Sequence, residues 1–165
     1  MGSELKYHQK IFDLDQIINV LALLQAAGKK IVFTNGCFDI LHIGHTRYLQ
    51  EARIAGDFLV VAVNSDESVR ALKTDKRPIV KLAERMEVLA GFSFVDFVIS
   101  FNDLDPYNII KRLQPDVLIK GGDWPVDKII GKDIVEAKGG NVYNIPEIKG
   151  NSTSNIINTI LNRYK

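Results

Sequence analysis

Short runs of β-branched and aromatic residues alternate with stretches of helical spacing along this chain, and this alternation constrains its fold most strongly. The strand-like runs are residues 31–34, 58–63, 95–100, 117–120 and 142–145. The stretches expected to be helical are residues 14–28, 44–56, 66–72, 82–91, 106–113, 127–138 and 152–164. Strands that are separated by helices run parallel within one sheet and are joined by right-handed crossovers. The sequence therefore predicts an α/β fold with a five-stranded parallel sheet and helices on both faces.

Polar residues follow three of these strand-like runs, at residues 35–45, 64–66 and 120–124. In a parallel α/β sheet the ligand binds outside the carboxyl ends of the strands, at the point where the strand order reverses. The three polar clusters would meet at that edge of the sheet, so they predict a binding site there.

The composition limits the possible partners and the location of the protein. With 165 residues, the chain is expected to form a single domain from residue 1 to residue 165. A formal net charge of +1 gives no general attraction to nucleic acid or membrane, and no apolar run reaches the roughly 18 residues of a membrane-spanning helix. One cysteine excludes an intramolecular disulfide, so the expected location is the reducing cytoplasm. The start, MGSELKYHQK, lacks the apolar core of a signal peptide, and residues 1–12 are expected to be poorly ordered or vector-derived.

Two of the three histidines, His42 and His45, lie three residues apart in the stretch TNGCFDILHIGHTRYL. Residues with this spacing at the start of a helix lie on one face, so both imidazoles can point the same way. One interpretation is a zinc site, for which Cys37 and Asp39 are the nearest further ligands, although the spacing differs from the His-Glu-x-x-His of zinc proteases. A second interpretation is ordinary capping and packing without any ligand.

A third interpretation is a phosphate-binding turn. Gly36 and Gly44 allow a ligand to approach the backbone closely, and the helix that begins near Gly44 offers unpaired N–H groups and the positive end of its dipole. Imidazoles on this turn can donate hydrogen bonds to phosphate oxygens, and Arg47 can add a forked contact. The chain contains neither GxxxxGK[ST] nor GxGxxG, which excludes a Walker loop and a dinucleotide-binding loop.

Two further clusters suit the same chemistry. The segment Lys-Gly-Gly-Asp-Trp at 120–124 places a cation and a double glycine at a strand end, where they serve a phosphate or a base better than packing. Trp124 can either flank a base or sugar or cover the adjacent loop. The segment Ser-Thr-Ser at 152–154 precedes a helix, and N-capping alone accounts for one of its hydroxyls.

The segment 35–45, Asn-Gly-Cys-Phe-Asp-x-x-His-x-Gly-His, resembles the first signature of the cytidylyltransferase-like nucleotidyltransferases, a superfamily with a Rossmann-like α/β domain. Within this superfamily the chain resembles the heptose 1-phosphate adenylyltransferase branch over residues 14–162. The resemblance is carried by TNGCFDILHIGH (34–45), AVNSD (62–66), DKRP (75–78), ERMEVL (84–89), IKGGDW (119–124) and STSNII (152–157).

The resemblance implies an enzyme that joins the AMP moiety of ATP to D-glycero-D-manno-heptose 1-phosphate. The products would be pyrophosphate and ADP-heptose, for lipopolysaccharide or surface glycan synthesis. It also implies ATP as a substrate, Mg²⁺ bound with ATP or pyrophosphate, a homodimer, and a separate kinase and phosphatase upstream. Three alternatives stay open: a cytidylyltransferase acting on glycerol 3-phosphate or another small phosphorylated alcohol, a nucleotide-binding module without catalysis, and a zinc-binding protein.

The resemblance assigns roles to single residues as well. His42, His45 and Lys73 are expected to be catalytic, because they would contact the phosphates and stabilise the transition state. Nucleotide or substrate contacts are expected at Asn35, Gly36, Cys37, Phe38, Asp39, Gly44, Arg47, Asn64, Asp66, Arg85, Lys120, Gly121, Gly122, Asp123, Trp124, Ser152, Thr153 and Ser154. No residue is expected to ligate a metal directly, and Asp39 would order its loop and help to place Mg²⁺ through water.

Some of these residues have a structural alternative. Asp66 can cap the helix at 66–72, Arg85 can form an ion pair on a helix surface, and Cys37 is expected to be a small packed residue. The superfamily's upstream arginine is absent, because this chain reads Glu-Ile-Lys-Gly at 147–150, where Lys149 is the nearest substitute.

Overall fold

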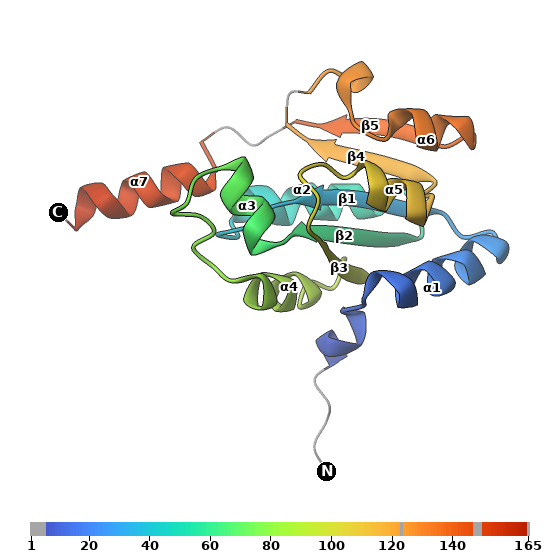
Figure 1. The fold of residues 1–165 in the computed structure, drawn as a ribbon, viewed down its shortest axis with the longest axis horizontal. Helices are drawn as coiled ribbons and strands as arrows, with labels where there is room; N and C mark the ends of the chain where they lie inside the picture. Colours follow the sequence, from blue (N-terminus) through green and yellow to red (C-terminus); the bar gives the residue numbers. More distant parts are fainter. Residues whose placement is uncertain (1–5, 123, 147–149, 165) are drawn as a thin grey trace, which may run out of the picture.

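The computed structural model describes residues 6–122, 124–146 and 150–164. Its strands are β1 (Ile31–Gly36), β2 (Phe58–Asn64), β3 (Phe97–Phe101), β4 (Val117–Gly121) and β5 (Asn141–Ile145). They form one sheet in the order β3-β2-β1-β4-β5, and every neighbouring pair is parallel (Figure 1). This arrangement confirms the predicted five-stranded parallel sheet.

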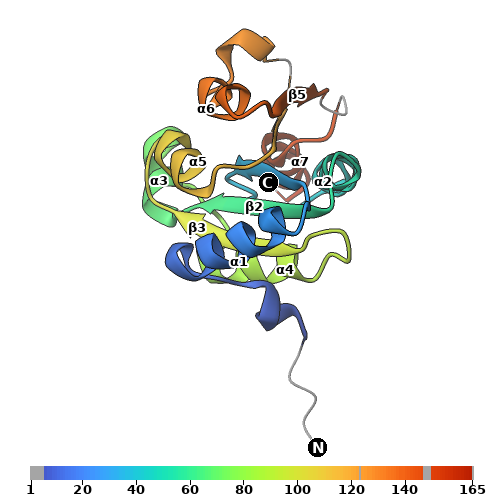
Figure 2. The same cartoon turned by 90° about the vertical axis from the view of Figure 1, so that its right-hand side faces the viewer.

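Helices cover both faces of the sheet, as predicted. The α-helices are α1 (Leu14–Ala26), α2 (Ile43–Ile54), α3 (Asp66–Leu72), α4 (Leu82–Ala90), α5 (Tyr107–Leu113), α6 (Lys132–Ala137) and α7 (Thr153–Arg163). Side chains of α2 and α4 pack on one face, against Val32, Val61 and Ile119, whereas α1, α5 and α6 pack on the other, against Phe33 and Val60 (Figure 2). Because β1, β2 and β4 are covered on both faces, their residues 31–33, 58–63 and 117–119 are apolar at successive positions rather than alternating.

Local signals account for where several helices begin and end. Asp13 caps α1, with its side chain accepting the N–H of Gln16 at 2.8 Å, and Gly28 with φ of 76° follows the helix. The helix predicted at 127–138 is wrong in its first half. A short 3-10 helix, η2 (Val126–Lys128), stands there instead, and the chain turns at Gly131 with φ of 88° before α6 begins. A Cβ at that glycine would lie 2.6 Å from the Cδ1 atom of Ile110, so the glycine allows the turn before α6 to pack closely on Ile110 of α5.

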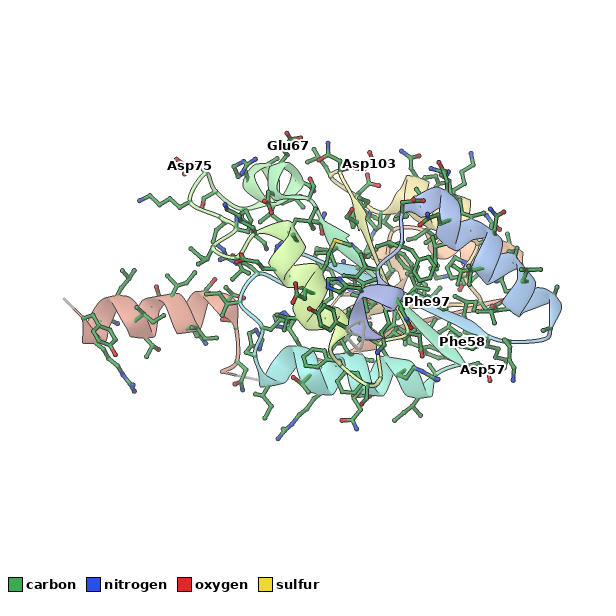
Figure 3. All side chains as sticks on the ribbon, turned by 90° about the horizontal axis from the view of Figure 1, so that it is seen from below. Asp57, Phe58, Glu67, Asp75, Phe97 and Asp103 are labelled. Atoms are coloured by element: carbon green, nitrogen blue, oxygen red, sulfur yellow. The ribbon has the colours of Figure 1, made fainter. Side chains whose placement is uncertain are left out.

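The amino-terminal segment is structured over residues 6–12, contrary to the expected poor order of residues 1–12. Lys6–Lys10 form a 3-10 helix, η1, and Phe12 donates its N–H to the carbonyl of Val98 at 3.0 Å. The Lys10 ammonium also donates to the carbonyl of Phe92 at 2.9 Å. The amino ends of β2 and β3 lie nearby, where the rings of Phe58 and Phe97 are in contact (Figure 3).

The strand order reverses between β1 and β4. From β1 the chain crosses to β2 and β3 on one side of the sheet, and later returns to β4 and β5 on the other. The carboxyl ends of β1 and β4 are therefore neighbours at the point where ligands bind in such sheets. Helix α7 extends outward from this edge (Figure 1), with no buried side chain among its described residues. No helix in the described ranges is long and apolar enough to cross a membrane.

Candidate active site

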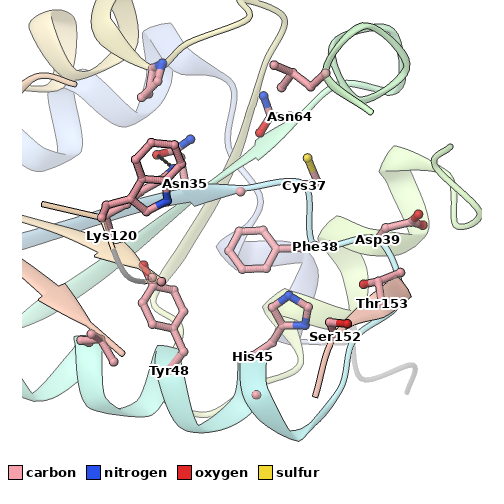
Figure 4. A pocket seen from close by; sticks show the side chains of 18 of the residues that line it. Asn35, Cys37, Phe38, Asp39, His45, Tyr48, Asn64, Lys120, Ser152 and Thr153 are labelled. Carbon is pink, nitrogen blue, oxygen red and sulfur yellow. Dashed lines mark hydrogen bonds between the residues drawn. The ribbon is translucent and has the colours of Figure 1, made fainter. Parts of the chain in front are cut away.

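A cavity of about 970 Å³ opens at the carboxyl edge of the sheet, a volume within the usual range for small-molecule sites. It is bounded by the ends of β1, β2 and β4 and by the N-terminal turns of α2 and α7 (Figure 4). The predicted residues that line it are Asn35, Gly36, Cys37, Phe38, Asp39, His42, Gly44, His45, Arg47, Asn64, Lys73, Lys120, Gly121, Gly122, Trp124, Ser152, Thr153 and Ser154. The three polar clusters of the sequence thus meet in one place, as their positions after parallel strands predict.

His42 is the N-cap of α2, and its side chain caps the helix in place of the usual hydroxyl or carboxylate. The Nδ1 atom of His42 accepts the N–H of Gly44 at 3.1 Å. A Cβ at Gly44 would lie 2.8 Å from the Cε1 atom of the same ring, so only glycine leaves room for this cap. Because Nδ1 is an acceptor here, neutral His42 carries its proton on Nε2, which is then a hydrogen-bond donor.

His45 lies on the first turn of α2, directly beside His42. The two ring centroids are 4.0 Å apart, which places both imidazoles on one face as the spacing predicts. The His45 ring also contacts Phe38, whose φ of 47° turns the chain into the loop before α2. Burial, and then the charge of the neighbouring His42, lower the pKa of His45 to about 4. His45 is therefore neutral near pH 7 and acts through hydrogen bonding rather than through a full charge.

The depressed pKa of His45 has a consequence for stability that can be measured. His45 takes up a proton near pH 6.5 in the unfolded chain but only near pH 4 in the folded one. Acidification between these values therefore favours unfolding and removes up to about 3 kcal/mol of stability. We expect the free energy of unfolding in urea to fall more steeply from about pH 7 to about pH 4.5 in the wild type than in a His45→Gln variant. Equal slopes for the two proteins would contradict a neutral buried His45.

Lys120 occupies the point where the strand order reverses. Its ammonium donates to the Oδ1 atom of Asn35 at 3.2 Å, which links the ends of β4 and β1 (Figure 4). Burial lowers the pKa of Lys120, and the positive charge of Lys73 lowers it further, whereas Cys37 opposes the shift. The cavity therefore holds a partly desolvated cation at its centre, and a second cation, Lys73, lies close enough to affect it.

Tyr48, which the sequence interpretation did not single out, packs against the carboxyl end of β4. Its hydroxyl hydrogen-bonds with that of Thr34 and donates to the carbonyl of Ile119 at 3.2 Å. A Cβ at Gly121 would lie 3.2 Å from the Tyr48 ring. Close packing on Tyr48 therefore explains the first glycine of the double glycine, while Gly122 has φ of 103°, which favours glycine. Tyr48 is three residues after His45, so helical spacing alone indicates that it shares the face of His45.

The N-terminus of α7 faces the same cavity. Ser152 caps the helix, with its Oγ atom accepting the N–H of Asn155 at 3.1 Å. The hydroxyl of Thr153 donates to the carbonyl of Ile40 at 3.3 Å and so ties α7 to the loop before α2. Two helices of more than ten residues thus direct their N-terminal N–H groups and positive dipole ends at one cavity, the arrangement that binds phosphate in many proteins.

The sequence profile of the cytidylyltransferase-like family matches residues 33–159, which include every cavity residue predicted from the sequence. The chain belongs to the cytidylyltransferase-like family. Among curated proteins, bifunctional protein HldE of Citrifermentans bemidjiense is 48% identical over 155 residues, which are 94% of this chain and 32% of that protein. Bifunctional protein HldE of Geobacter sulfurreducens is 46% identical, with the same shares of the two chains covered. The chain thus spans about a third of the length of these relatives.

Solved structures of similar fold agree with this assignment. A lipopolysaccharide core biosynthesis protein from Thermoplasma volcanium is 30% identical with a TM-score of 0.61, over 75% of this chain and 100% of that one. A pantoate-beta-alanine ligase from Francisella tularensis, solved in complex with beta-gamma ATP and beta-alanine, superposes with a TM-score of 0.59 over 93% of this chain and 76% of that one. At 16% identity, the second likeness shows the fold alone.

Two residues that the family resemblance assigned to ligand contact, Asp66 and Arg85, do not line the cavity of this cytidylyltransferase-like chain. The Arg85 side chain is fully buried and donates to the carboxylate of Asp66 at 2.7 Å, to the carbonyl of Val80 at 3.0 Å and to the carbonyl of Cys37. An arginine on α4 turns inward because three acceptors from three segments engage all three nitrogens of its guanidinium group. Asp66 is not the cap of α3 either, since the side chain of Ser65 takes that role.

Some of the remaining predicted site residues are exposed to solvent, and two lie outside the described residues. Lys73 and Arg47 are exposed residues of the cavity lining, and so is Trp124, which is 55% exposed. Asp123 and Lys149 lie outside the described residues. The cavity also includes residues that the sequence interpretation missed, because they come from loops after β3 and β4 without a recognisable motif. These are Leu104, Asp105, Pro106, Lys128, Ile129 and Ile130.

The geometry weakens the zinc and thiol interpretations. In the ranges that the structure describes, no three side chains of His, Cys, Asp or Glu lie close enough to hold a metal ion. The Nδ1 atom of His42 is engaged with backbone, and Asp39 is fully engaged with other partners. Burial raises the pKa of the Cys37 thiol even though Lys73 and Arg85 oppose that shift, so the thiol is protonated near pH 7 and is a poor nucleophile.

Proposed function

We propose that this chain transfers the AMP moiety of ATP to D-glycero-D-manno-heptose 1-phosphate, releasing pyrophosphate and forming ADP-heptose for lipopolysaccharide or surface glycan synthesis. One observation supports the transfer chemistry above all others. The paired histidines at the N-terminus of α2 share a single cavity with Lys120 and with the N-terminus of α7. Such a set of donors and cations matches the oxygens of a nucleoside triphosphate and the charge that develops on them.

The proposed reaction needs no strong general base. A sugar phosphate is already an anion near neutral pH, so one of its oxygens can attack the α-phosphorus of ATP in line while pyrophosphate leaves. The protein then positions the reactants and neutralises the charge spread over the phosphates. His42 offers an Nε2–H donor, and the ammonium groups of Lys73 and Lys120 provide exposed and partly buried positive charge, respectively.

Mg²⁺ fits this site as part of the substrate complex MgATP. The one carboxylate of the signature turn, Asp39, accepts hydrogen bonds from two backbone N–H groups and from Arg77. Burial opposes ionisation of Asp39, but the N–H groups of Val80 and Ile79 and the Arg77 guanidinium outweigh it and lower the pKa of Asp39. Since proteins often leave Mg²⁺ to phosphate oxygens and water, the nucleotide itself would carry the ion here.

The heptose acceptor is supported by the sequence markers of that branch, AVNSD, KGGDW and STSNII, because described residues of all three line the cavity. They are Asn64, Lys120, Gly121, Gly122, Trp124, Ser152, Thr153 and Ser154. The similar structure from Thermoplasma volcanium is described as a lipopolysaccharide core biosynthesis protein, which suits a sugar-nucleotide product. The curated relatives are named bifunctional, and the matched part is about a third of their length. The bifunctional name of these relatives counts against the predicted separate kinase, whereas the phosphatase and the homodimer stay predictions for this chain.

A pyrophosphate-release assay that pairs ATP or CTP with a panel of sugar and polyol phosphates tests the proposal. We expect release with ATP and heptose 1-phosphate, and little or none when CTP replaces ATP or when the acceptor is omitted. Release with CTP and glycerol 3-phosphate would assign the chain to a sibling cytidylyltransferase instead. If no pair released pyrophosphate, the enzyme proposal would be wrong, and a nucleotide-binding module would be the better description.

A further inference from the structure

A segment between α3 and α4, residues 73–81, crosses the rim of the cavity without regular secondary structure; we name it the strap. Residues 73–76 are exposed, and Asp75 lies at the outer edge of the molecule (Figure 3). Two of its cations, Lys73 and Arg77, line the cavity. An exposed segment of this kind orders its cations only if something anchors it to the rigid body of the protein.

The first anchor is Asp39 in the turn after β1. Its side chain is completely inaccessible to solvent, and that of its partner Arg77 is 14% exposed. The Oδ1 atom of Asp39 accepts the N–H groups of Ile79 and Val80, both at 2.8 Å, and its Oδ2 atom accepts the Nε–H of Arg77. All three of these donors come from the strap, and although Asp39 lies in the wall of the cavity, its side chain has no solvent-accessible surface.

The second anchor is Arg85 on α4. Its guanidinium donates to the carbonyl of Val80 in the strap and to the carbonyl of Cys37 in the turn after β1, and it pairs with Asp66 at the start of α3. Arg85 thus joins the turn that carries the signature residues to the carboxyl end of the strap and to the start of α3, the helix that precedes the strap. Both anchors join the turn after β1 to the strap. Asp39 does so with a carboxylate from the turn, and Arg85 does so with a guanidinium group from α4, which follows the strap.

We propose that Asp39 and Arg85 are positioning residues that hold Lys73 and Arg77 over the phosphates of the nucleotide, and that neither touches substrate or metal. This inference rests on the proposed nucleotidyl transfer for its catalytic part, whereas the anchoring itself does not depend on the reaction. Asp39 and Arg85, which the sequence predicts to contact nucleotide or substrate, would thus act indirectly. They fix the turn and the strap relative to one another, and Lys73 and Arg77 of the strap supply the positive charge.

Asp39→Asn is the decisive variant, because it keeps the size of the side chain but replaces one acceptor oxygen by an NH₂ donor facing Arg77. We expect trypsin to cleave the variant after Lys73 or Lys76 at least about tenfold faster than the wild type, because loosened exposed segments are the preferred sites of nicking. We also expect kcat to fall by roughly 100-fold, the effect of misplacing catalytic groups by about 1 Å. The Mg²⁺ concentration that gives half-maximal rate should not change.

Arg85→Lys is the second variant, which keeps the charge but cannot reach all three acceptors. We expect it to show the same faster cleavage, and circular dichroism would confirm that both variants are folded. The chain offers a matched control pair in Asp15 and Arg112, which form an exposed ion pair remote from the cavity. Asp15→Asn and Arg112→Lys repeat the two chemical changes and should leave cleavage and kcat at wild-type values.

The outcomes separate this inference from its rivals. Wild-type cleavage of the strap in Asp39→Asn would overturn the anchoring role, and a raised Mg²⁺ requirement would assign Asp39 to metal placement instead. In a Lys73→Ala background, Asp39→Asn should lower kcat much less than it does alone, because both changes act through the strap; full additivity would overturn the inference. If the wild type transferred no nucleotide at all, the cleavage rates would still decide whether the anchors hold the strap.

Discussion

His42→Ala and His45→Ala should each lower kcat for nucleotidyl transfer by about 100-fold or more, the usual effect of removing a preorganised donor from a charge-stabilising site. His42 presents its Nε2–H group because Nδ1 is engaged by the N–H of Gly44, and His45 is held neutral by burial beside it. Alanine removes a donor from the place where negative charge grows, and at position 42 it also removes the cap of α2. Steady-state kinetics with MgATP and the acceptor would measure the effect.

The third histidine provides the control for this experiment. His8 is exposed in the 3-10 helix η1, remote from the cavity, so His8→Ala should retain the wild-type kcat. The loss in the His42 and His45 variants should appear mainly in kcat, because the interaction strengthens in the transition state. Near wild-type turnover in both variants would remove the phosphate role from the pair and return it to capping and packing.

Lys120→Met should lower kcat/KM by about 100-fold or more, because it removes a charge from a water-poor position while keeping the apolar stem. The ammonium lies at the reversal of strand order, 3.2 Å from the Oδ1 atom of Asn35, and its depressed pKa reflects its burial. A partly desolvated cation interacts with phosphate more strongly than one in bulk water. Rates measured at low MgATP concentration would report this loss directly.

An exposed lysine serves as the comparison for Lys120. Lys111→Met changes the same residue type on the outer side of α5 and should leave kcat/KM unchanged. Lys120→Arg should restore only part of the activity, because the larger planar group does not fit the place of a compact ammonium. If Lys120→Met matched the Lys111 control, the cation at the strand reversal would have no part in the reaction.

The fold was predictable because the hydrophobic pattern of each segment agreed with the order in which strands and helices alternate along the chain. Strand runs such as FLVVAV are apolar at successive positions, which favours strands buried on both faces, and the helical stretches between them require parallel pairing. The polar residues after β1, β2 and β4 correctly predicted which edge of the sheet carries the cavity. The predicted helix at 127–138 failed because nothing in its spacing shows that Gly131 must adopt positive φ beside Ile110.

The site was less predictable where the role of a residue depends on the direction in which its side chain points. Arg85 matches a family motif for ligand contact, yet it turns inward because acceptors from three segments meet there, a coincidence that spacing alone does not reveal. Gly44 and Gly121 were attributed to close approach of a ligand, but the rings of His42 and Tyr48 occupy the space that a Cβ would need. Such packing reasons appear only once the side chains are placed.

The fate of heavy oxygen in the acceptor phosphate tests the central claim most directly. Heptose 1-phosphate labelled with oxygen-18 in its non-bridging phosphate oxygens would be incubated with unlabelled MgATP, and the products separated and weighed by mass spectrometry. If an acceptor oxygen attacks the α-phosphorus, ADP-heptose retains all of the label, including the oxygen that bridges its two phosphorus atoms, and the pyrophosphate contains none. Label in the pyrophosphate, or formation of ADP together with a sugar bisphosphate, would contradict nucleotidyl transfer at this site.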